Sequence, residues 1–129
     1  MSCVIGYKHG GHVYMGADGR ATTEDGECRP IICKKIFRNG PYLIGFCGSV
    51  RAGQLLYEEV FEAPKSIHDL ANSIRDQYGE HGALVQDPES GDRHGANILI
   101  ATESNKKLYE ILTDFQISEV PSFTSIGSG

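Results

Sequence analysis

The chain has 129 residues, which is enough for one domain with its own core and too few for two comfortable ones. The composition is that of a soluble globular protein, and a net charge of −5 without a basic stripe argues against nucleic acid as a partner. Neither a run of roughly 20 apolar residues nor a secretory signal is found, so we expect a cytoplasmic protein without a membrane partner.

Cysteine and histidine spacing does not predict a metal site. The chain has four cysteines, Cys3, Cys28, Cys33 and Cys47. They form no CxxC pair. We therefore favour small reduced thiols, and structural disulfides are the alternative. His9 and His12 flank a Gly-Gly turn. Two ligands without a third make a weak metal site, so exposed turn histidines are the favoured interpretation.

A hairpin is predicted at the front of the chain. A short strand begins within residues 1–5, a turn follows at 9–12, and a second strand covers 13–17. The second strand ends at Asp18, so the hairpin brings residue 2 and Asp18 to the same end of two neighbouring strands. A nucleophile that is also a chain terminus would need this arrangement.

Further strands, interrupted by helices, are predicted in the rest of the chain. The predicted elements are, in order, a polar loop or short extended crossing at 19–30, strands at 31–38 and 42–47 around Asn39-Gly40, helices at 49–62 and 66–79, a polar loop at 79–95, and strands at 96–101, 107–113 and 123–126. Residues 114–120 are expected to continue the strand before them, up to Pro121. This order indicates an α+β fold with two antiparallel sheets covered by helices.

Apolar residues at helical spacing mark the buried face of each predicted helix. In the first helix, the apolar row and its neighbours are Ala52, Leu56, Val60, Tyr57 and Phe61. The second helix begins after Ser66, a capping residue supported by Asp69 three positions on. Its apolar stripe consists of Ile67, Leu70, Ala71, Ile74 and Tyr78.

Four motifs resemble a known family in their order and spacing. They are residues 16–22 (GADGRAT), 34–36 (KKI), 41–49 (PYLIGFCGS) and 125–129 (SIGSG). Together they look like the proteasome β-subunit and HslV-type peptidases, which are N-terminal-nucleophile hydrolases. The resemblance implies a single domain over 1–129, an αββα sandwich of two antiparallel sheets flanked by helices. It covers only the front part of the family domain, so the fold would be truncated at its C-terminus.

By this resemblance, five residues would carry catalysis: Ser2, Asp18, Lys35, Gly48 and Ser128. Ser2 stands where the family has its N-terminal threonine. Lys35 beside this nucleophile would favour its ionised form, and Asp18 would keep the lysine charged. The Gly48 N–H, between a strand and a helix, suits a developing oxyanion, and Ser128 would lie near the terminal amine.

The chemistry of a terminal hydroxyl supports these roles. A free α-amine has a pKa of ~7.7–8.0 and can serve as the base for a hydroxyl on its own residue. This mechanism uses no cofactor and no metal, but it requires that Met1 be removed. Lys34 competes with Lys35 for the lysine position, and alignment on Lys-Lys-Ile favours Lys35.

The resemblance also implies a binding site for an extended polypeptide. Residues 20–22 correspond to the strand that holds substrate through main-chain hydrogen bonds. Ala21 and Thr22 would therefore bind substrate, and Cys47 with Ala21 would border the side-chain pocket. The resemblance further implies a homo-oligomeric ring, fed with unfolded polypeptides by an ATP-dependent unfoldase.

The favoured hypothesis is an N-terminal-serine endopeptidase that forms an acyl-enzyme on unfolded polypeptides inside a ring. The alternative is a non-catalytic structural or assembly subunit of the same fold, which a retained Met1 would favour. A more distant alternative is a small-molecule amidase on this fold. Asp18, Lys35 and Gly48 disfavour a pure scaffold, because a scaffold needs none of them.

Overall fold

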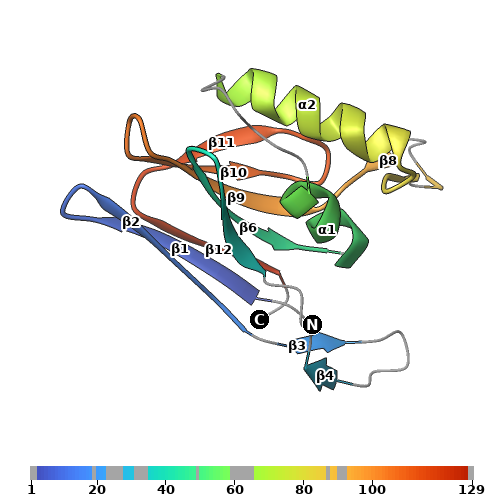
Figure 1. Cartoon of the computed structure of the whole chain (residues 1–129), viewed down its shortest axis with the longest axis horizontal. Coiled ribbons are helices and arrows are strands. Elements are labelled where there is room, and N and C mark those ends of the chain that lie inside the picture. The colour runs from blue at the N-terminus through green and yellow to red at the C-terminus, as the bar shows by residue number, and fades with distance from the viewer. Residues whose placement is uncertain are drawn as a thin grey trace.

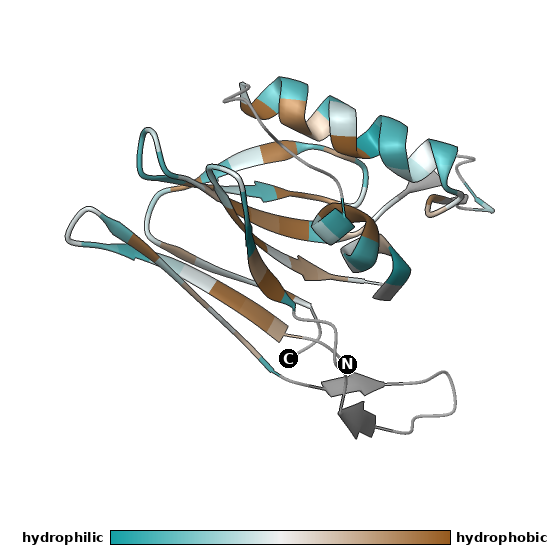
Figure 2. Cartoon of the chain, in the orientation of Figure 1, coloured by the Kyte–Doolittle hydropathy of each residue, from teal (hydrophilic) through white to brown (hydrophobic). Residues whose placement is uncertain are grey.

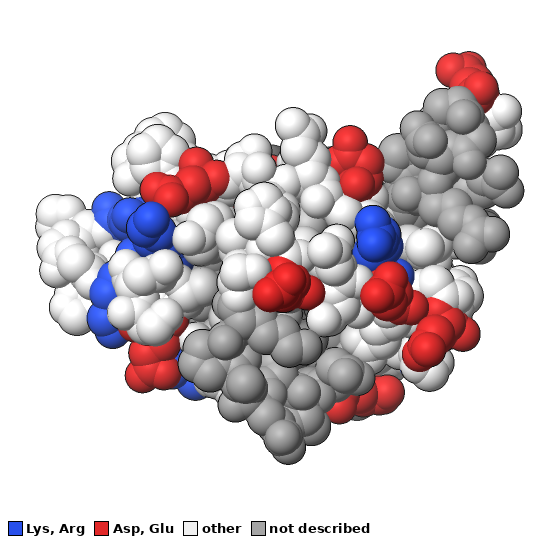
Figure 3. All heavy atoms as spheres, turned by 90° about the horizontal axis from the view of Figure 1, so that it is seen from above, with Lys and Arg blue, Asp and Glu red and all other residues white. Residues whose placement is uncertain are grey.

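The computed structural model describes residues 3–18, 20–22, 28–30, 35–48, 50–58, 66–86, 88–89 and 93–127. No helix within these ranges is long and apolar enough to cross a membrane. On the face seen in Figure 3, the coloured Lys and Arg side chains lie beside Asp and Glu, without a continuous stripe of one sign.

Two antiparallel sheets form the body of the described chain (Figure 1). Their strands are β1 (Cys3–His9), β2 (His12–Ala17), β5 (Ile36–Asn39), β6 (Tyr42–Cys47), β9 (Asn97–Thr102), β10 (Lys107–Ile111), β11 (Ile117–Val120) and β12 (Phe123–Gly127). The smaller sheet has the order β12-β1-β2 and the larger sheet the order β11-β10-β9-β6-β5. The predicted α+β fold with two antiparallel sheets is confirmed.

Two short strand pairs lie within the predicted loops. They are β3 (Arg20–Thr22) with β4 (Cys28–Pro30), and β7 (Val85–Gln86) with β8 (Arg93–His94). The first pair agrees with the expectation that 19–30 would include an extended crossing.

Glycine turns close two of the hairpins as predicted. His9 pairs with His12 across Gly10 and Gly11, and both glycines have positive φ, which a type I′ turn requires. Both histidines are exposed, as expected for turn positions. The β5–β6 hairpin likewise turns at Gly40, with φ 59°.

The helices α1 (Val50–Glu58) and α2 (Ile67–Glu80) both cover the larger sheet (Figure 1). The Ser66 hydroxyl caps α2 by accepting a hydrogen bond from the Asp69 N–H at 3.1 Å, as predicted. The buried residues of α2 are Leu70, Ala71, Ile74 and Tyr78. Within the described ranges, no helix lies on the outer face of the smaller sheet, so the observed layers are helices, sheet, sheet.

The core has one apolar layer on each face of the larger sheet. Between helices and sheet, Leu56, Ile74 and Ile100 are fully buried. Between the two sheets, Val4 and Leu99 are fully buried. The central strand β9 contributes to both layers because successive side chains point to opposite faces. It is accordingly among the most hydrophobic segments in Figure 2.

One helix-face prediction was wrong. Tyr57 is 63% exposed, because it lies at the margin of the buried face of α1. Its ring packs edge-on against Phe37 at a centroid distance of 5.3 Å. Leu55 occupies the buried face instead, beside Ala52 and Leu56. The predicted positions 60 and 61 lie outside the described residues.

The prediction that 114–120 continue the preceding strand was also wrong. The chain reverses after β10, and β11 returns antiparallel to it. The Leu112 N–H donates to Gln116 O at 2.9 Å, and the Asp114 carboxylate accepts from the Gln116 N–H at 3.1 Å. An aspartate that binds the backbone two residues on is a turn former, so Asp114 favours a reversal at this point.

Candidate functional site

Asp18 follows β2 and lies beside the start of β1. The register pairs Val4 with Ala17, so Cys3 and Asp18 are neighbours at the same end of the hairpin. The Asp18 N–H donates to Cys3 O, and the Cys3 N–H donates to an Asp18 carboxylate oxygen, each at 3.2 Å. The Asp18 carboxylate is therefore held next to Cys3, the residue that follows position 2.

Lys35 reaches the same carboxylate from the larger sheet. It lies immediately before β5, where its carbonyl accepts from the Phe46 N–H at 3.1 Å. Its Nζ donates to Asp18 Oδ1 at 2.6 Å, so the predicted pair is brought together. Among the described residues, Lys35 is the one charged residue that is buried. A lysine is rarely buried unless it is paired, which makes this contact informative.

The charge of Asp18 follows from its hydrogen bonds. The bond from Lys35, and then the bond from the Cys3 N–H, hold the pKa of Asp18 below its ordinary value of 3.8. Desolvation of the carboxylate opposes them with a smaller effect. Asp18 is thus a negatively charged carboxylate at neutral pH and forms an ion pair with the Lys35 ammonium group.

Gly48 occupies the turn between β6 and α1. Its φ of 152° lies in a region that residues with side chains rarely adopt. A Cβ added at this position would lie 2.9 Å from the Ala96 Cβ. Both the backbone conformation and the space therefore require glycine. Gly48 is exposed, so a ligand can approach its main chain.

Cys47, the residue before Gly48, points into the core between the sheets. Its thiol donates to Ile126 O at 3.4 Å, which links β6 to β12. Burial raises the pKa of Cys47, although the nearby Lys35 acts in the opposite direction. This thiol therefore stays protonated and is a poor nucleophile. Cys3 and Cys47 are both free thiols, as favoured from the sequence.

The remaining predicted site residues are only partly placed. Ser2, Lys34 and Ser128 lie outside the described residues. Cys3, which follows Ser2, pairs with Gly127, which precedes Ser128. Residues 21 and 22 lie in β3, where they pair with 29 and 28. Their roles in substrate binding stay predictions.

The sequence did not predict that the Cys3 N–H donates to the same Asp18 carboxylate as Lys35 does. The signal for it was the hairpin register. Once Ala17 is opposite Val4, Asp18 must stand opposite Cys3. Asp18, Lys35 and the Cys3 main chain thus form one connected group, whereas Gly48 and Cys47 lie at the end of β6.

Comparison by sequence found no matching family model and no matching curated protein. Comparison by structure found clear neighbours. The Thiobacillus denitrificans protein BPH matches with a TM-score of 0.78 and 21% identity, over 98% of this chain and 72% of its own. That protein has also been solved in complex with epoxomicin.

Two further neighbours are an Anbu protein and an HslV protein. Anbu (ancestral beta-subunit) from Yersinia bercovieri matches with a TM-score of 0.68 and 12% identity, over 97% of this chain and 60% of its own. HslV from Trypanosoma brucei matches with a TM-score of 0.60 and 16% identity, over 98% of this chain and 71% of its own. At these identities the likeness concerns the fold. The chain has the proteasome-like N-terminal-nucleophile hydrolase fold that its motifs predicted.

Proposed function

We propose that this protein is an endopeptidase whose nucleophile is the hydroxyl of Ser2, exposed as the chain terminus by removal of Met1. The observation that carries the proposal is the buried Lys35 ammonium, 2.6 Å from Asp18, whose carboxylate also accepts from the Cys3 N–H. The pair is half-buried, and it is joined to the backbone next to the proposed terminal serine. It is suited to activating that serine.

The catalytic steps follow from this arrangement. The α-amine of Ser2 takes the hydroxyl proton, and the oxygen attacks the carbonyl carbon of a peptide bond. Lys35 stabilises the negative charge that develops on the hydroxyl oxygen, and Asp18 holds the Lys35 side chain in place by accepting its hydrogen bond. The Gly48 N–H donates to the carbonyl oxygen as it becomes negative. The amine then protonates the leaving nitrogen, and water hydrolyses the resulting ester.

The substrate is proposed to be an unfolded polypeptide, held in extended form along residues 20–22 by main-chain hydrogen bonds. Ala21 and Thr22 would border the substrate side chains, and Ser128 would hydrogen-bond near the terminal amine. The predicted pocket role of Cys47 is not proposed, because its thiol lies in the core between the sheets and donates to Ile126 O. We further propose a homo-oligomeric ring and an ATP-dependent unfoldase as partner. These last features rest on the motif resemblance and on the fold shared with HslV.

Removal of Met1 and loss of activity on changing Ser2 test the mechanism. Intact-mass measurement of the protein from its native source is expected to show a chain without Met1. Ser2→Ala should abolish hydrolysis of an unfolded protein such as casein, while Ser118→Ala, a change on the exposed face of β11, should not. Hydrolysis at the wild-type rate by Ser2→Ala would refute the mechanism.

The same measurements distinguish the non-catalytic alternative. A chain that retains Met1 and hydrolyses nothing, yet assembles, would be a structural subunit. Epoxomicin gives a second readout, since a neighbour of this fold has been solved with it. Binding is expected for the processed wild type and not for Ser2→Ala.

A further inference from the structure

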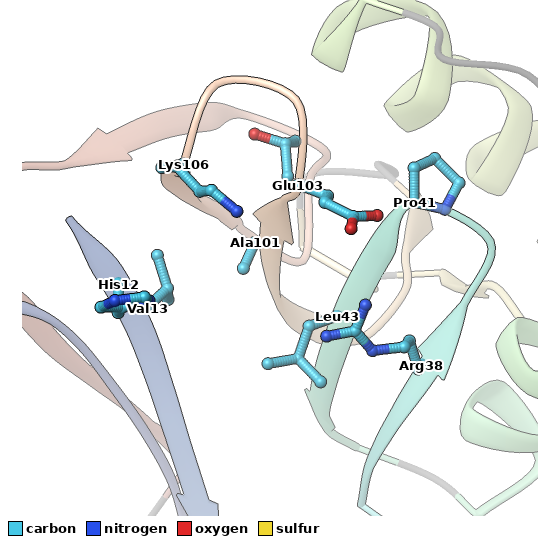
Figure 4. A pocket seen from close by; sticks show the side chains of 9 residues that line it. His12, Val13, Arg38, Pro41, Leu43, Ala101, Glu103 and Lys106 are labelled. Atoms are coloured by element: carbon cyan, nitrogen blue, oxygen red, sulfur yellow. The ribbon is translucent and has the colours of Figure 1, made fainter.

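A cavity lies far from Asp18, where three hairpins of the two sheets meet (Figure 4). It has a volume of about 150 Å³ and is bordered by the β1–β2, β5–β6 and β9–β10 turns. From Val13, which lines it, to Asp18 the chain advances about 17 Å along an extended strand. The cavity therefore cannot share a small ligand with the Asp18–Lys35 pair.

Three charged side chains surround the cavity. The ends of Lys106 and Arg38 point into the space between the hairpins, and the Glu103 carboxylate extends from the β9–β10 turn toward the β5–β6 hairpin (Figure 4). Within the described part of the chain, none of the three is in an ion pair. Two cations and one anion thus face the same small volume without neutralising one another.

The turn that carries Lys106 and Glu103 is held rigidly. The Glu103 N–H donates to Pro41 O, and the Lys106 N–H donates to Thr102 O, each at 3.0 Å. Asn105 also accepts from the Thr102 hydroxyl. In this turn Lys106 has a φ of 54°, which is uncommon for a residue with a side chain. Glycine would adopt this φ at a lower cost, so a lysine at this position favours a binding role for its ammonium group.

The rest of the cavity wall combines the polar residues His12 and Thr102 with apolar side chains. Val13 and Leu43 are half-buried, Ala101 is buried, and all three line the cavity. The volume corresponds to about five water molecules at ~30 Å³ each, which matches the size of a small molecule. A complementary ligand has one carboxylate, one ammonium group and a short aliphatic body.

We propose that this cavity binds a free α-amino acid with a small aliphatic side chain. Its carboxylate contacts Arg38 and Lys106, its ammonium contacts Glu103, and its side chain lies on Leu43 and Ala101. A simple carboxylate would leave Glu103 as a repulsive neighbour, and a simple amine would face two cations. Only a zwitterion pairs every charge. The proposal does not depend on peptidase activity.

Titration with L-valine, followed by ¹H–¹⁵N NMR, tests the ligand class. L-Valine is expected to shift the amide signals of residues 103–106. N-acetyl-L-valine, which lacks the ammonium, and isobutylamine, which lacks the carboxylate, should each bind at least about tenfold more weakly. Equal binding of either analogue, or no shift at about 10 mM L-valine, would overturn the proposal.

Two variants test the assigned contacts. Lys106→Gly removes the ammonium while suiting the backbone at φ 54°, so the fold should be kept. It should weaken L-valine binding at least about tenfold. Glu103→Gln should weaken L-valine but not N-acetyl-L-valine. Lys107→Ala, which removes an exposed pair with Glu119 at 3.2 Å, is the control. Wild-type affinity in Lys106→Gly would refute the site.

Discussion

At the scale of single residues, the burial of Lys35 determines what its neighbours must be. A buried ammonium loses hydration, and the loss is offset only by close partners. Asp18 is such a partner from the other sheet, with its side chain still 41% exposed. Because water screens that side of the pair, we expect its stabilising effect to be moderate and dependent on pH.

The pH dependence of stability has a definite sign. The folded pKa of Asp18 is lowered below 3.8, so its contribution is present above that pH and is lost as pH falls through the folded pKa. Urea unfolding should show wild type more stable than Asp18→Asn at pH 7, with the difference shrinking below about pH 4. A difference that stays constant down to pH 2 would contradict the assignment.

Lys35 offers a kinetic test that rests on the proposed function. Lys35→Met keeps the apolar stem but removes the charge, and it should lower peptide hydrolysis by about 10²–10³-fold. Lys107→Met is the matched control, because Lys107 is 44% exposed and lies in an ordinary surface pair. An unchanged rate in Lys35→Met would indicate Lys34, or no lysine, in catalysis.

Gly48 offers a test of backbone strain. Gly48→Ala should destabilise the protein by about 2 kcal/mol, because alanine tolerates φ 152° poorly and its Cβ would meet Ala96. Gly16→Ala is the control, since a Cβ there meets only Ile5 at an ordinary 3.6 Å. Thermal unfolding of both variants measures the difference. Equal stability would mean that the turn relaxes easily.

At the scale of elements, local signals decided which predictions succeeded. The α2 helix was predicted with its cap and its buried face because Ser66 and the apolar spacing act within a few residues. The reversal before β11 was missed because the turn former Asp114 is followed by Phe115, which has φ 68° and is not a usual turn residue. The pairing of β12 with β1 joins chain segments about 120 residues apart, and no local pattern encodes such a partner.

In the strand β12, the position of a side chain determines its burial more strongly than its residue type does. Ile126 is 4% exposed, whereas Phe123 is 78% exposed on the outer face of the sheet. Ile126→Ala should cost about 2–5 kcal/mol in unfolding free energy. Phe123→Ala should change it by no more than about 0.5 kcal/mol. Comparable losses for the two variants, measured by urea unfolding, would show that Phe123 is covered in solution.

At the scale of the whole molecule, the candidate site could be predicted only in part. The motifs predicted that Asp18 and Lys35 act together, and the structure pairs these two side chains. They could not show that the Asp18 carboxylate binds Lys35 and the Cys3 main chain together. That contact depends on how closely the two sheets pack, through residues such as Val4 and Leu99.

The central place of β1 has a consequence for how the chain end behaves. Most protein termini fray, but β1 is paired on one side with β2 and on the other with β12, starting from Cys3. The conformational entropy of the β1 backbone from Cys3 onward is therefore lost when the protein folds, before any ligand arrives. A reactive group placed there would meet its substrate already oriented, and binding would not have to immobilise it.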